Sequence, residues 1–565
     1  MTVLSFSVAL SATLVACGGG GASAPGASPT PPPPPAATGS VTLTGIAARG
    51  AALAGAAVSI KCAGGNGSAT TSTSGAFSVA ITGASLPCAF QVTGTDGTVL
   101  HSLRAGSENT GSFNVNITPL TELVVARAAG ATPSSFFTGY AAASAPSAAT
   151  VTQAIDAVRS ATAGVVDLTG INPITDTLVA AYAGTAGNAL DQKIDSLGAA
   201  LTAAQTTLAQ VSSALVANPT ATGPVATILQ PTASTCAWLR SGKYRMIDPS
   251  ESDPLWRAHV LTLNSATLTA TLFTGEVINL TDQGGCKFTV DDASSLSTIV
   301  VSSAGVLVVQ QQSKSNPADV SVVVGLPEQS LPLSDFAGTW NFANWYSISG
   351  SAQNDFVAEV LEVAIDATGQ ITSAQSCEGL SPCVTEPPPQ PKLVVNATSG
   401  GFDMVEGTTT IGRFFLFKNG AGLPTLVGAF GGGDVLAGTL KRSLGTLPAV
   451  GTVSAFRELA LRGSGAVDLL IDNTVTITTA DAATKTVTRT RSSDNRVDTL
   501  SYDKPRDGLR HRAQNACTTN GAVTPCAQTV QIPLPGSGIT LSLSAGSVNV
   551  PQSSFFNISV SRPGN

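Results

Sequence analysis

The chain has 565 residues, and its 28 Lys and Arg against 35 Asp and Glu give a formal net charge of -7. Only 11% of the residues are charged, whereas about 25% is usual in soluble proteins. Contacts to nucleic-acid phosphates need concentrated Lys and Arg, so this composition argues against nucleic acid as a partner. The length predicts about four domains at roughly 150 residues each.

The beginning of the chain predicts export. An apolar run from Val3 to Ala16 is followed by a single cysteine, in the order Leu14-Val15-Ala16-Cys17. The run is too short to span a bilayer, which takes about twenty apolar residues, but it has the length of a signal-peptide core. The pattern resembles the signal peptide and lipobox of bacterial lipoproteins. That resemblance implies removal of residues 1–16, a diacylglyceryl group on the Cys17 sulfur, and a lipid-anchored position in the cell envelope, with Gly18 favouring the outer membrane.

Residues 17–39 are predicted to be a tether between the lipid and the folded body. Gly18 to Gly21 is a flexible run, and Pro31 to Pro35 favours an extended polyproline II rod. Such a segment cannot form a compact core.

Residues 40–118 are predicted to form a β-sandwich. Apolar and polar residues alternate over residues 41–44, 58–62 and 77–81, as in strands with one buried face. The order of small and apolar residues resembles the carboxypeptidase regulatory-like, prealbumin-like domain. The residues that carry this resemblance are Gly50, Leu53 to Val58, Gly75 to Phe77, and Pro87. The resemblance implies a non-catalytic sandwich of a kind found in surface proteins.

Residues 119–217 are predicted to be helical. Thr118 can cap a helix, and Pro119 suits the first helical position. A long helix is predicted from about Leu190 to Leu215, because its apolar residues alternate steps of four and three along a heptad seam. The opposite face carries Ala, Thr and Gln, which favours one helix of an intramolecular bundle. A coiled coil between subunits is the alternative.

Residues 218–235 are predicted to be a linker, and three β-rich units are predicted after it, at 236–330, 331–445 and 446–565. Strands recur about every ten residues, which favours antiparallel barrels or sandwiches. The motif Gly338-Thr339-Trp340 is similar to the first strand of lipocalin-type barrels, and the segment from Trp238 to Tyr244 is predicted to begin a related unit. The chain is therefore predicted to be multidomain and mainly β, with a helical middle.

Eight cysteines remain besides Cys17, and they fall into neighbouring pairs within separate segments. An even number in an exported chain predicts disulfides. The sequence leaves their connectivity open, and pairing within each segment is the simplest choice. Zinc is disfavoured, because there is no Cys-x-x-Cys motif. The eight are Cys62, Cys88, Cys236, Cys286, Cys377, Cys383, Cys517 and Cys526.

No catalytic, cofactor or metal site is predicted. Nucleophilic hydrolysis usually needs a base beside its nucleophile, but the three histidines lie in three different segments, as His101, His259 and His511. The chain has no Gly-x-Ser-x-Gly elbow, phosphate-binding Lys loop or His-Glu-x-x-His helix. Hydrolysis by paired carboxylates needs no histidine, so a carbohydrate-active enzyme is the alternative. Its candidate carboxylates are Asp355, Glu359 and Glu362.

Aromatic residues supply the candidate ligand-facing positions. All four tryptophans lie in one region, as Trp238, Trp256, Trp340 and Trp345. Aromatic side chains bind sugars and apolar ligands, but they also fill barrel cores. The basic stretch from Lys485 to Arg512 suits anionic envelope polymers, and its simpler interpretation is a solvated face of mixed charge.

These patterns predict a lipid-anchored envelope lipoprotein with a non-catalytic binding or surface-structural role. Its predicted partners are the membrane, through the lipid anchor, and a glycan, lipid or protein ligand. Two other classes remain open. One is an exported carbohydrate-active enzyme with paired carboxylates, and the other is a lipid or small-molecule carrier in a calycin-like barrel.

Overall fold

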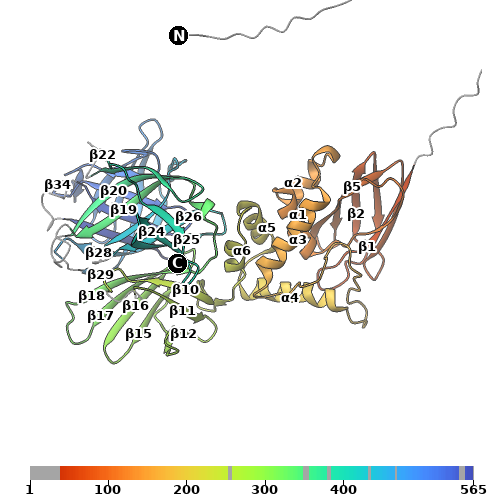
Figure 1. Ribbon diagram of the computed structural model, residues 1–565, viewed down its shortest axis with the longest axis horizontal. Helices are drawn as coiled ribbons and strands as arrows, with labels where there is room; N and C mark the ends of the chain where they lie inside the picture. The colour runs from red at the N-terminus through yellow and green to blue at the C-terminus, as the bar shows by residue number, and fades with distance from the viewer. Residues whose placement is uncertain are drawn as a thin grey trace, which may run out of the picture. The chain divides into compact units, whose positions relative to one another are not determined.

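The computed structural model describes residues 39–251, 257–347, 356–377, 383–430, 434–464, 467–545 and 554–563 (Figure 1). It is mainly β with a helical middle, which confirms the predicted fold class. Residues from Gly39 to Asn565 form one compact unit. Cys17, the predicted signal peptide and the predicted tether up to residue 38 lie outside the described residues and stay predictions.

Seven strands in two sheets make up the first β region. One sheet has the order β4-β1-β7 and the other the order β3-β2-β5-β6. The alternating residues predicted to face inward, such as Val41 and Ile60, are buried in one core. The strands are β1 (Ser40–Ile46), β2 (Ala57–Ala63), β3 (Gly65–Thr70), β4 (Ala76–Thr82), β5 (Ser85–Thr93), β6 (Val99–Arg104) and β7 (Gly111–Asn114).

Six α-helices follow the sandwich in the described part of the chain. The first begins as predicted, because Thr118 caps it, Pro119 opens it and Thr121 completes a capping box. The segment predicted to be a linker contains the sixth helix and a short strand, and its Val225 and Leu229 are fully buried. The helices are α1 (Pro119–Ala129), α2 (Pro133–Thr138), α3 (Ala148–Thr162), α4 (Ala189–Ala203), α5 (Leu208–Ala217) and α6 (Gly223–Ile228).

The prediction of one helix from Leu190 to Leu215 is wrong, because the chain turns between α4 and α5. Gln205 has a positive φ of 47°, which ends α4. Thr207 then caps α5, and the side chain of Gln210 completes a second capping box. Leu197 and Leu215 nevertheless pack in the same core, which favours the intramolecular bundle over a coiled coil.

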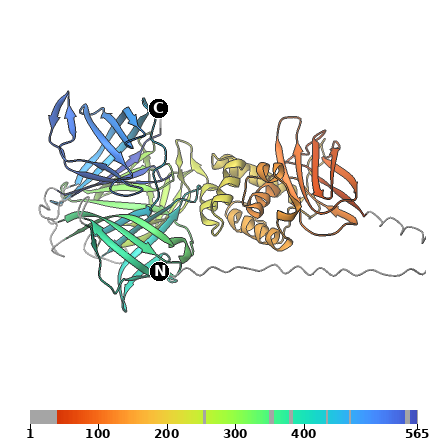
Figure 2. The same cartoon turned by 90° about the horizontal axis from the view of Figure 1, so that it is seen from above.

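Three large antiparallel sheets dominate the described residues after the helices, and the third is blue in Figure 2. The first has the strand order β13-β12-β11-β10-β18-β17-β16-β15-β14. The second repeats this topology, with the order β22-β21-β20-β19-β27-β26-β25-β24-β23. In each of these two sheets, the strand that comes first in chain order pairs with the strand that comes last, β10 with β18 and β19 with β27. The edge strands follow one another in the chain, so each sheet curls into a barrel-like meander.

The strands of the first two sheets have the following bounds. The first sheet contains β10 (Gly242–Ile247), β11 (Ala258–Asn264), β12 (Thr269–Leu272), β13 (Val277–Asn279), β14 (Thr281–Asp282), β15 (Lys287–Asp291), β16 (Ser295–Val301), β17 (Leu307–Ser313) and β18 (Val320–Pro327), and a hairpin of β8 (Thr232–Ala233) and β9 (Cys236–Arg240) precedes it. The second contains β19 (Gly338–Ser347), β20 (Phe356–Ile365), β21 (Ile371–Cys377), β22 (Cys383–Thr385), β23 (Lys392–Val395), β24 (Phe402–Glu406), β25 (Thr409–Lys418), β26 (Pro424–Phe430) and β27 (Val435–Leu440).

The third sheet closes into a ring of eight strands, because β30 pairs with β31 and β37 returns to β28. A hairpin of β33 and β34 extends it at β31. Its strands are β28 (Val453–Arg462), β29 (Val467–Asp481), β30 (Thr486–Arg491), β31 (Arg496–Tyr502), β32 (Arg510–Arg512), β33 (Cys517–Thr519), β34 (Ala522–Thr524), β35 (Thr529–Leu534), β36 (Ile539–Ser544) and β37 (Phe555–Ser561).

The first two sheets open in the same way. Gly242 and Gly338, with φ of 130° and 138°, begin β10 and β19, where a side chain would strain the backbone. Two residues later, the Tyr244 hydroxyl donates to the Arg240 carbonyl at 2.9 Å, and the Trp340 indole donates to the Phe336 carbonyl at 2.7 Å. In both sheets, an aromatic side chain donates to the carbonyl four residues before it. The segments beginning at Trp238 and Gly338, which were predicted to open related units, therefore share this hydrogen bond.

Four disulfides join cysteines that neighbour one another in chain order. They are Cys62–Cys88, Cys236–Cys286, Cys377–Cys383 and Cys517–Cys526. Two of them link register partners on adjacent strands, β2 with β5 and β21 with β22. The bonds therefore brace separate regions of the chain and do not tie one region to another.

Replacing Tyr244 with Phe tests the hydrogen bond that begins the first sheet. Tyr244 is 1% exposed, and burial raises its pKa to about 12, so its hydroxyl stays a donor at neutral pH. Tyr244→Phe should lower the free energy of unfolding by about 1–2 kcal/mol, because the partly buried Arg240 carbonyl loses its side-chain partner. Tyr182→Phe, at an exposed tyrosine, should change it by less than about 0.5 kcal/mol in the same urea titration. Equal effects of the two substitutions would contradict this role.

Candidate ligand-binding cavity

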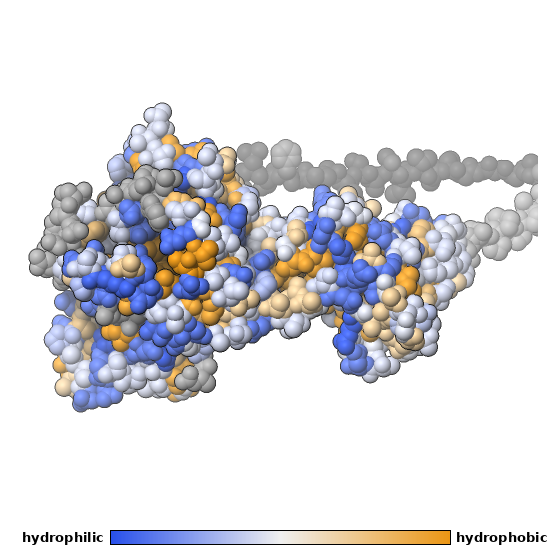
Figure 3. Space-filling view, turned by 90° about the horizontal axis from the view of Figure 1, so that it is seen from below, coloured by the Kyte–Doolittle hydropathy of each residue, from blue (hydrophilic) through white to orange (hydrophobic). Residues whose placement is uncertain are grey.

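A cavity of about 570 Å³ lies among the three C-terminal sheets and is lined by residues of all three. Volumes of about 300–1,000 Å³ are typical of sites for small molecules. Most of its lining residues are of apolar types, and representative ones are Val308, Val322, Trp345, Val427, Leu541 and Phe556. Figure 3 shows apolar surface gathered on one face of this half of the molecule.

The cavity is formed by the outer faces of the three sheets. Apolar side chains from these faces pack into one shared cluster, whereas the interiors of the first and second sheets hold clusters of their own. Strand β18 shows the division, because Val322 faces the shared cluster and its neighbour Val323 faces the interior of the first sheet. Successive side chains of a strand point to opposite faces, so both faces of this strand are buried.

Three aromatic residues form one part of the wall. Trp345 is 4% exposed and stacks on Phe356, with ring centroids 5.5 Å apart and an interplanar angle of 6°. Phe556 packs against the same indole at 6.1 Å. These rings come from β19, β20 and β37, so the second and third sheets both contribute to the surface that a ligand would contact. Flat apolar surfaces of this kind suit an acyl chain or another apolar body.

Polar side chains also line the cavity. Asp319 and Ser321 come from the β17–β18 region, and Arg462 comes from the end of β28. Arg462 is paired with Asp468, and both side chains keep about two-fifths of their surface exposed. A polar group at one end of a ligand therefore has hydrogen-bonding partners, whereas the Val, Leu and Phe side chains offer none.

Of the three candidate tryptophans that the structure describes, one lines this cavity. Trp345 does, whereas Trp340 is fully buried in the interior cluster of the second sheet and Trp238 is half-buried beside that of the first. Trp256 lies outside the described residues. The roles of Phe356 and Phe556 in the wall were not predicted from the sequence. Their signal was weak, because a short apolar run does not reveal which face of a strand meets a ligand.

The structure separates the candidate carboxylates. Glu359 accepts a hydrogen bond from the Asn344 amide at 2.8 Å, and Glu362 pairs with Lys441 at 2.8 Å and Arg506 at 3.1 Å. The two glutamates lie on opposite faces of β20, because they are three residues apart in one strand. Asp355 lies outside the described residues.

The histidines also stay apart, on β6, β11 and β32, in three different sheets. Within the described ranges, no group of three or more His, Cys, Asp or Glu side chains is placed to hold a metal ion. No helix in that same part of the chain is both long and apolar enough to cross a bilayer.

A pair of matched substitutions tests whether the cavity is empty space. Val322 and Val323 are adjacent and equally buried, at 7% and 6% exposure, but only Val322 lines the cavity. Val322→Met should change the free energy of unfolding by less than about 1 kcal/mol, because the longer side chain has room, whereas Val323→Met should cost about 1–3 kcal/mol by overpacking. Chemical denaturation of both variants measures the difference. A cost at Val322 as large as at Val323 would mean that the cavity is filled.

Comparisons with known proteins assign the chain to no family. No family model matches it, and no curated protein matches it. Among solved structures, it is similar to an isotype 1 transferrin-binding protein B from serogroup B Neisseria meningitidis, at 11% identity and a TM-score of 0.16, over 54% of this chain and 63% of that one. It is also similar to a DUF3598 family protein of unknown function from Nostoc punctiforme, at 10% identity and a TM-score of 0.17, over 42% of this chain and 100% of that one. This chain thus spans less than two thirds of the Neisseria protein, and TM-scores this low carry no argument about function.

Proposed function

We propose that the protein is an envelope lipoprotein that binds a single-chain amphiphile, without catalysis, in the cavity among its three C-terminal sheets. The observation that carries this proposal is the volume of about 570 Å³ bounded by apolar residues of all three sheets. An apolar cavity of this size loses favourable contacts when it is empty, and it gains them when an apolar body enters.

The apolar side chains of the cavity wall favour a ligand with an acyl chain. Each methylene group moved from water into an apolar site contributes about 0.8 kcal/mol, so a chain of about ten methylenes contributes roughly 8 kcal/mol before the cost of association. The stacked rings of Trp345 and Phe356 offer one rigid side to such a chain. Asp319, Ser321 and Arg462 offer hydrogen bonds to its polar end.

The site differs from a calycin-like carrier in its position. In the calycin-like alternative, the ligand would lie inside a single barrel. Here the interior of the second sheet is filled around Trp340 and Phe342, and a smaller space of about 150 Å³ remains there. The larger space lies between sheets. The proposal therefore keeps the carrier chemistry and moves the ligand to the shared cavity.

The anchor is a separate part of the proposal, and the lipobox pattern ending at Cys17 supports it. One acyl chain gives only marginal membrane binding, whereas two or more hold firmly. The proposed domain order is a tether at 17–39, a β-sandwich at 40–118, a helical domain at 119–217, a linker at 218–235 and the β-rich units at 236–330, 331–445 and 446–565. In this order the tether, the β-sandwich and the helical domain separate Cys17 from the amphiphile-binding half along the chain.

Displacement of a dansyl-labelled undecanoic acid by hexadecanoic acid tests the cavity. The full chain should bind both, and Val322→Phe should weaken binding at least tenfold, because the larger ring occupies the cavity. Val323→Met is the matched control, since it alters the neighbouring side chain inside the first sheet, and it should bind within about twofold of the unsubstituted chain. Absence of binding by the unsubstituted protein, or equal binding by Val322→Phe, would contradict the proposal.

Metabolic labelling with radioactive palmitate tests the anchor. Cells expressing the full chain should produce a labelled protein in the membrane fraction, and Cys17→Ser should abolish the label because the acceptor sulfur is gone. The disulfide-bonded Cys62 and Cys88 provide the control, since their double replacement by Ser should leave the label in place. Label that persists in Cys17→Ser would refute attachment at this residue and would leave the cavity proposal intact.

A further inference from the structure

The interior of the third sheet differs in polarity from the interiors of the other two. The first and second sheets enclose apolar clusters, whereas the third encloses only a small one, formed by Ile477, Val487, Leu500 and Tyr502. Most of the other inward positions are polar or charged, although Ala460 and Val475 also face inward. Eight-stranded closed barrels have an interior just wide enough to be filled by side chains or to hold one small ligand.

Strand register identifies which residues face inward. Val530, Ile532 and Leu534 of β35 belong to the shared cluster outside the barrel, so Gln531 faces the interior. Gln531 is paired with Arg510 on one side and with Ser542 on the other, and register partners share a face. Arg510 is in turn the partner of Tyr502, which belongs to the interior cluster.

Strand register also contradicts the predicted solvated face for part of the basic stretch from Lys485 to Arg512. Arg489 is the register partner of Asp498, and both lie on the face of Leu500. Asp498 is 3% exposed and Arg512 is 6% exposed. That interpretation is therefore wrong for these arginines, which the β30–β32 strands direct into the barrel. A period of two in the sequence does not reveal which of two faces meets water.

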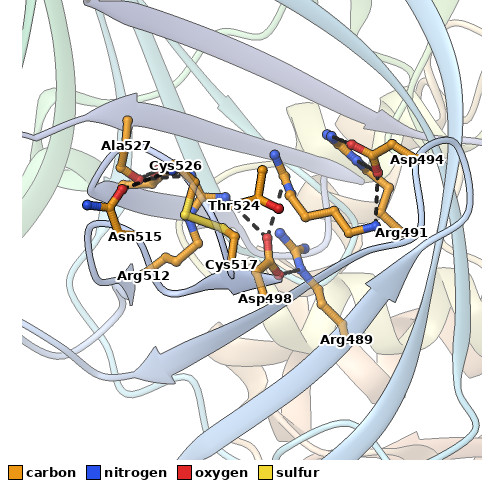
Figure 4. Close-up of a disulfide and its surroundings, with 12 residues drawn as sticks. Arg489, Arg491, Asp494, Asp498, Arg512, Asn515, Cys517, Thr524, Cys526 and Ala527 are labelled. Carbon is orange, nitrogen blue, oxygen red and sulfur yellow. Dashed lines mark hydrogen bonds and ion pairs between the residues drawn. A yellow bond between two sulfur atoms is a disulfide. The ribbon is translucent and has the colours of Figure 1, made fainter. Parts of the chain in front are cut away.

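Asp498 is the centre of this interior cluster. Its carboxylate pairs with Arg489 at 2.7 Å, Arg512 at 3.2 Å and Arg496 at 3.5 Å, and Figure 4 shows the first two of these guanidinium groups around it. Burial alone would raise the pKa of Asp498, but attraction and hydrogen bonding by the three arginines together hold it below its usual range. The carboxylate is therefore ionised at neutral pH.

The cluster carries more positive than negative charge. Five arginines face the interior, namely Arg489, Arg491, Arg496, Arg510 and Arg512. The carboxylates beside them are Asp494, Asp498 and Glu458, so five positive charges face three negative ones. Among the described residues, no carboxylate acts on the Arg510 charge, and its guanidinium lies over the Tyr502 ring at 4.7 Å. Burial lowers the pKa of Arg510, which measures the cost of enclosing its charge.

Several buried polar atoms of the same interior have no partner. They are the Nε atoms of Arg496, Arg510 and Arg512, the Gln531 Oε1 and the Asn557 Oδ1. An unpaired buried polar atom costs about 1–3 kcal/mol, so a cluster of them in one interior indicates missing partners. The unpaired nitrogens need an acceptor, and the unpaired oxygens need a donor. Gln531 is 8% exposed, and Arg512 6%, so bulk water alone does not serve them.

We propose that the interior of the third barrel binds an oxyanion group of a hydroxylated small molecule, such as a sugar acid or a polyol phosphate. The oxyanion accepts hydrogen bonds from Arg510 and Arg512, and the ligand hydroxyl groups donate to Gln531 Oε1 and Asn557 Oδ1. Planar guanidinium groups suit carboxylate and phosphate oxygens because they offer paired donors. The side chains of Arg489, Arg491 and Arg496 keep 17–22% exposure, so solvent reaches one part of this interior.

The Cys517–Cys526 disulfide helps to hold the site (Figure 4). Cys517 is the register partner of Asp498, and Cys526 precedes Ala527, whose carbonyl accepts a hydrogen bond from Arg512 at 2.9 Å. The Thr529 hydroxyl accepts from the same guanidinium at 2.7 Å. The outer Nη2 of Arg512 is thus fixed by the protein, and its Nε remains for the ligand.

Isothermal titration of the full chain with gluconate and with glycerol phosphate tests the proposal, with sodium chloride at matched ionic strength as the baseline. At least one anion should bind and should be displaced by excess of the other, which shows a shared site. The two arms distinguish carboxylate from phosphate as the preferred group. Glycerol and inorganic phosphate, titrated separately, should each bind at least tenfold more weakly than the molecule that combines hydroxyl groups with the oxyanion.

Substitutions then locate the site. Arg510→Gln should weaken binding at least tenfold, and Arg510→Lys should give an intermediate loss because it keeps the charge and removes the paired donors. Arg562→Gln is the matched control, because Arg562 pairs with Asp472 at 2.6 Å on the outer face of the same barrel, and it should bind like the unsubstituted chain. A thermal melt of each variant confirms that it is folded.

Two results would overturn the proposal. If neither anion binds above the chloride baseline, the arginines form only a structural charge network around Asp498. If Arg562→Gln weakens binding as much as Arg510→Gln, the anions bind the outer surface through general electrostatics. Neither result bears on hexadecanoic acid, which has its own site, so this test is independent of the function proposed above.

Discussion

The structure depends on one packing arrangement, in which three curled sheets turn apolar outer faces toward one another. Strand β18 and the first half of β17 are therefore buried on both sides, which explains their short apolar runs at residues 307–309 and 322–324. Curled sheets are convex on the outside, and three convex surfaces cannot fill the space at their common centre. The cavity of about 570 Å³ follows from this geometry, and its wall is apolar because the packing that creates it is apolar.

The third sheet shows how that arrangement separates two kinds of chemistry. Its apolar residues, such as Ile532 and Leu541, are placed outside, where they complete the shared cluster. Its interior is thereby left to Arg510, Gln531 and their polar neighbours. Burying this many charges is costly unless each is paired. The apolar centre and the polar interior lie on opposite faces of the same strands, so the amphiphile and the hydrophilic anion that we propose would contact opposite faces of one sheet.

Local signals in the sequence predicted local structure well. Alternation predicted the strands of the sandwich, and the Thr118-Pro119 cap predicted the start of α1. The heptad seam between Leu190 and Leu215 failed because apolar spacing is the same in one helix and in two helices that pack on one core, and the positive φ of Gln205 has no strong sequence signal. The cavity and the arginine cluster were beyond prediction, since both depend on which face of a strand meets another sheet, and that is set by contacts between residues far apart in sequence.

The most direct test of the central arrangement is a crystal structure of the full chain soaked with a terminally brominated hexadecanoic acid. The account predicts a single anomalous bromine peak in the cavity beside Trp345, Phe356 and Phe556, with Val322 in contact and Val323 pointing away into the first sheet. A structure in which the three outer faces close on one another without a space, or in which bromine is found only on the molecular surface, would contradict it.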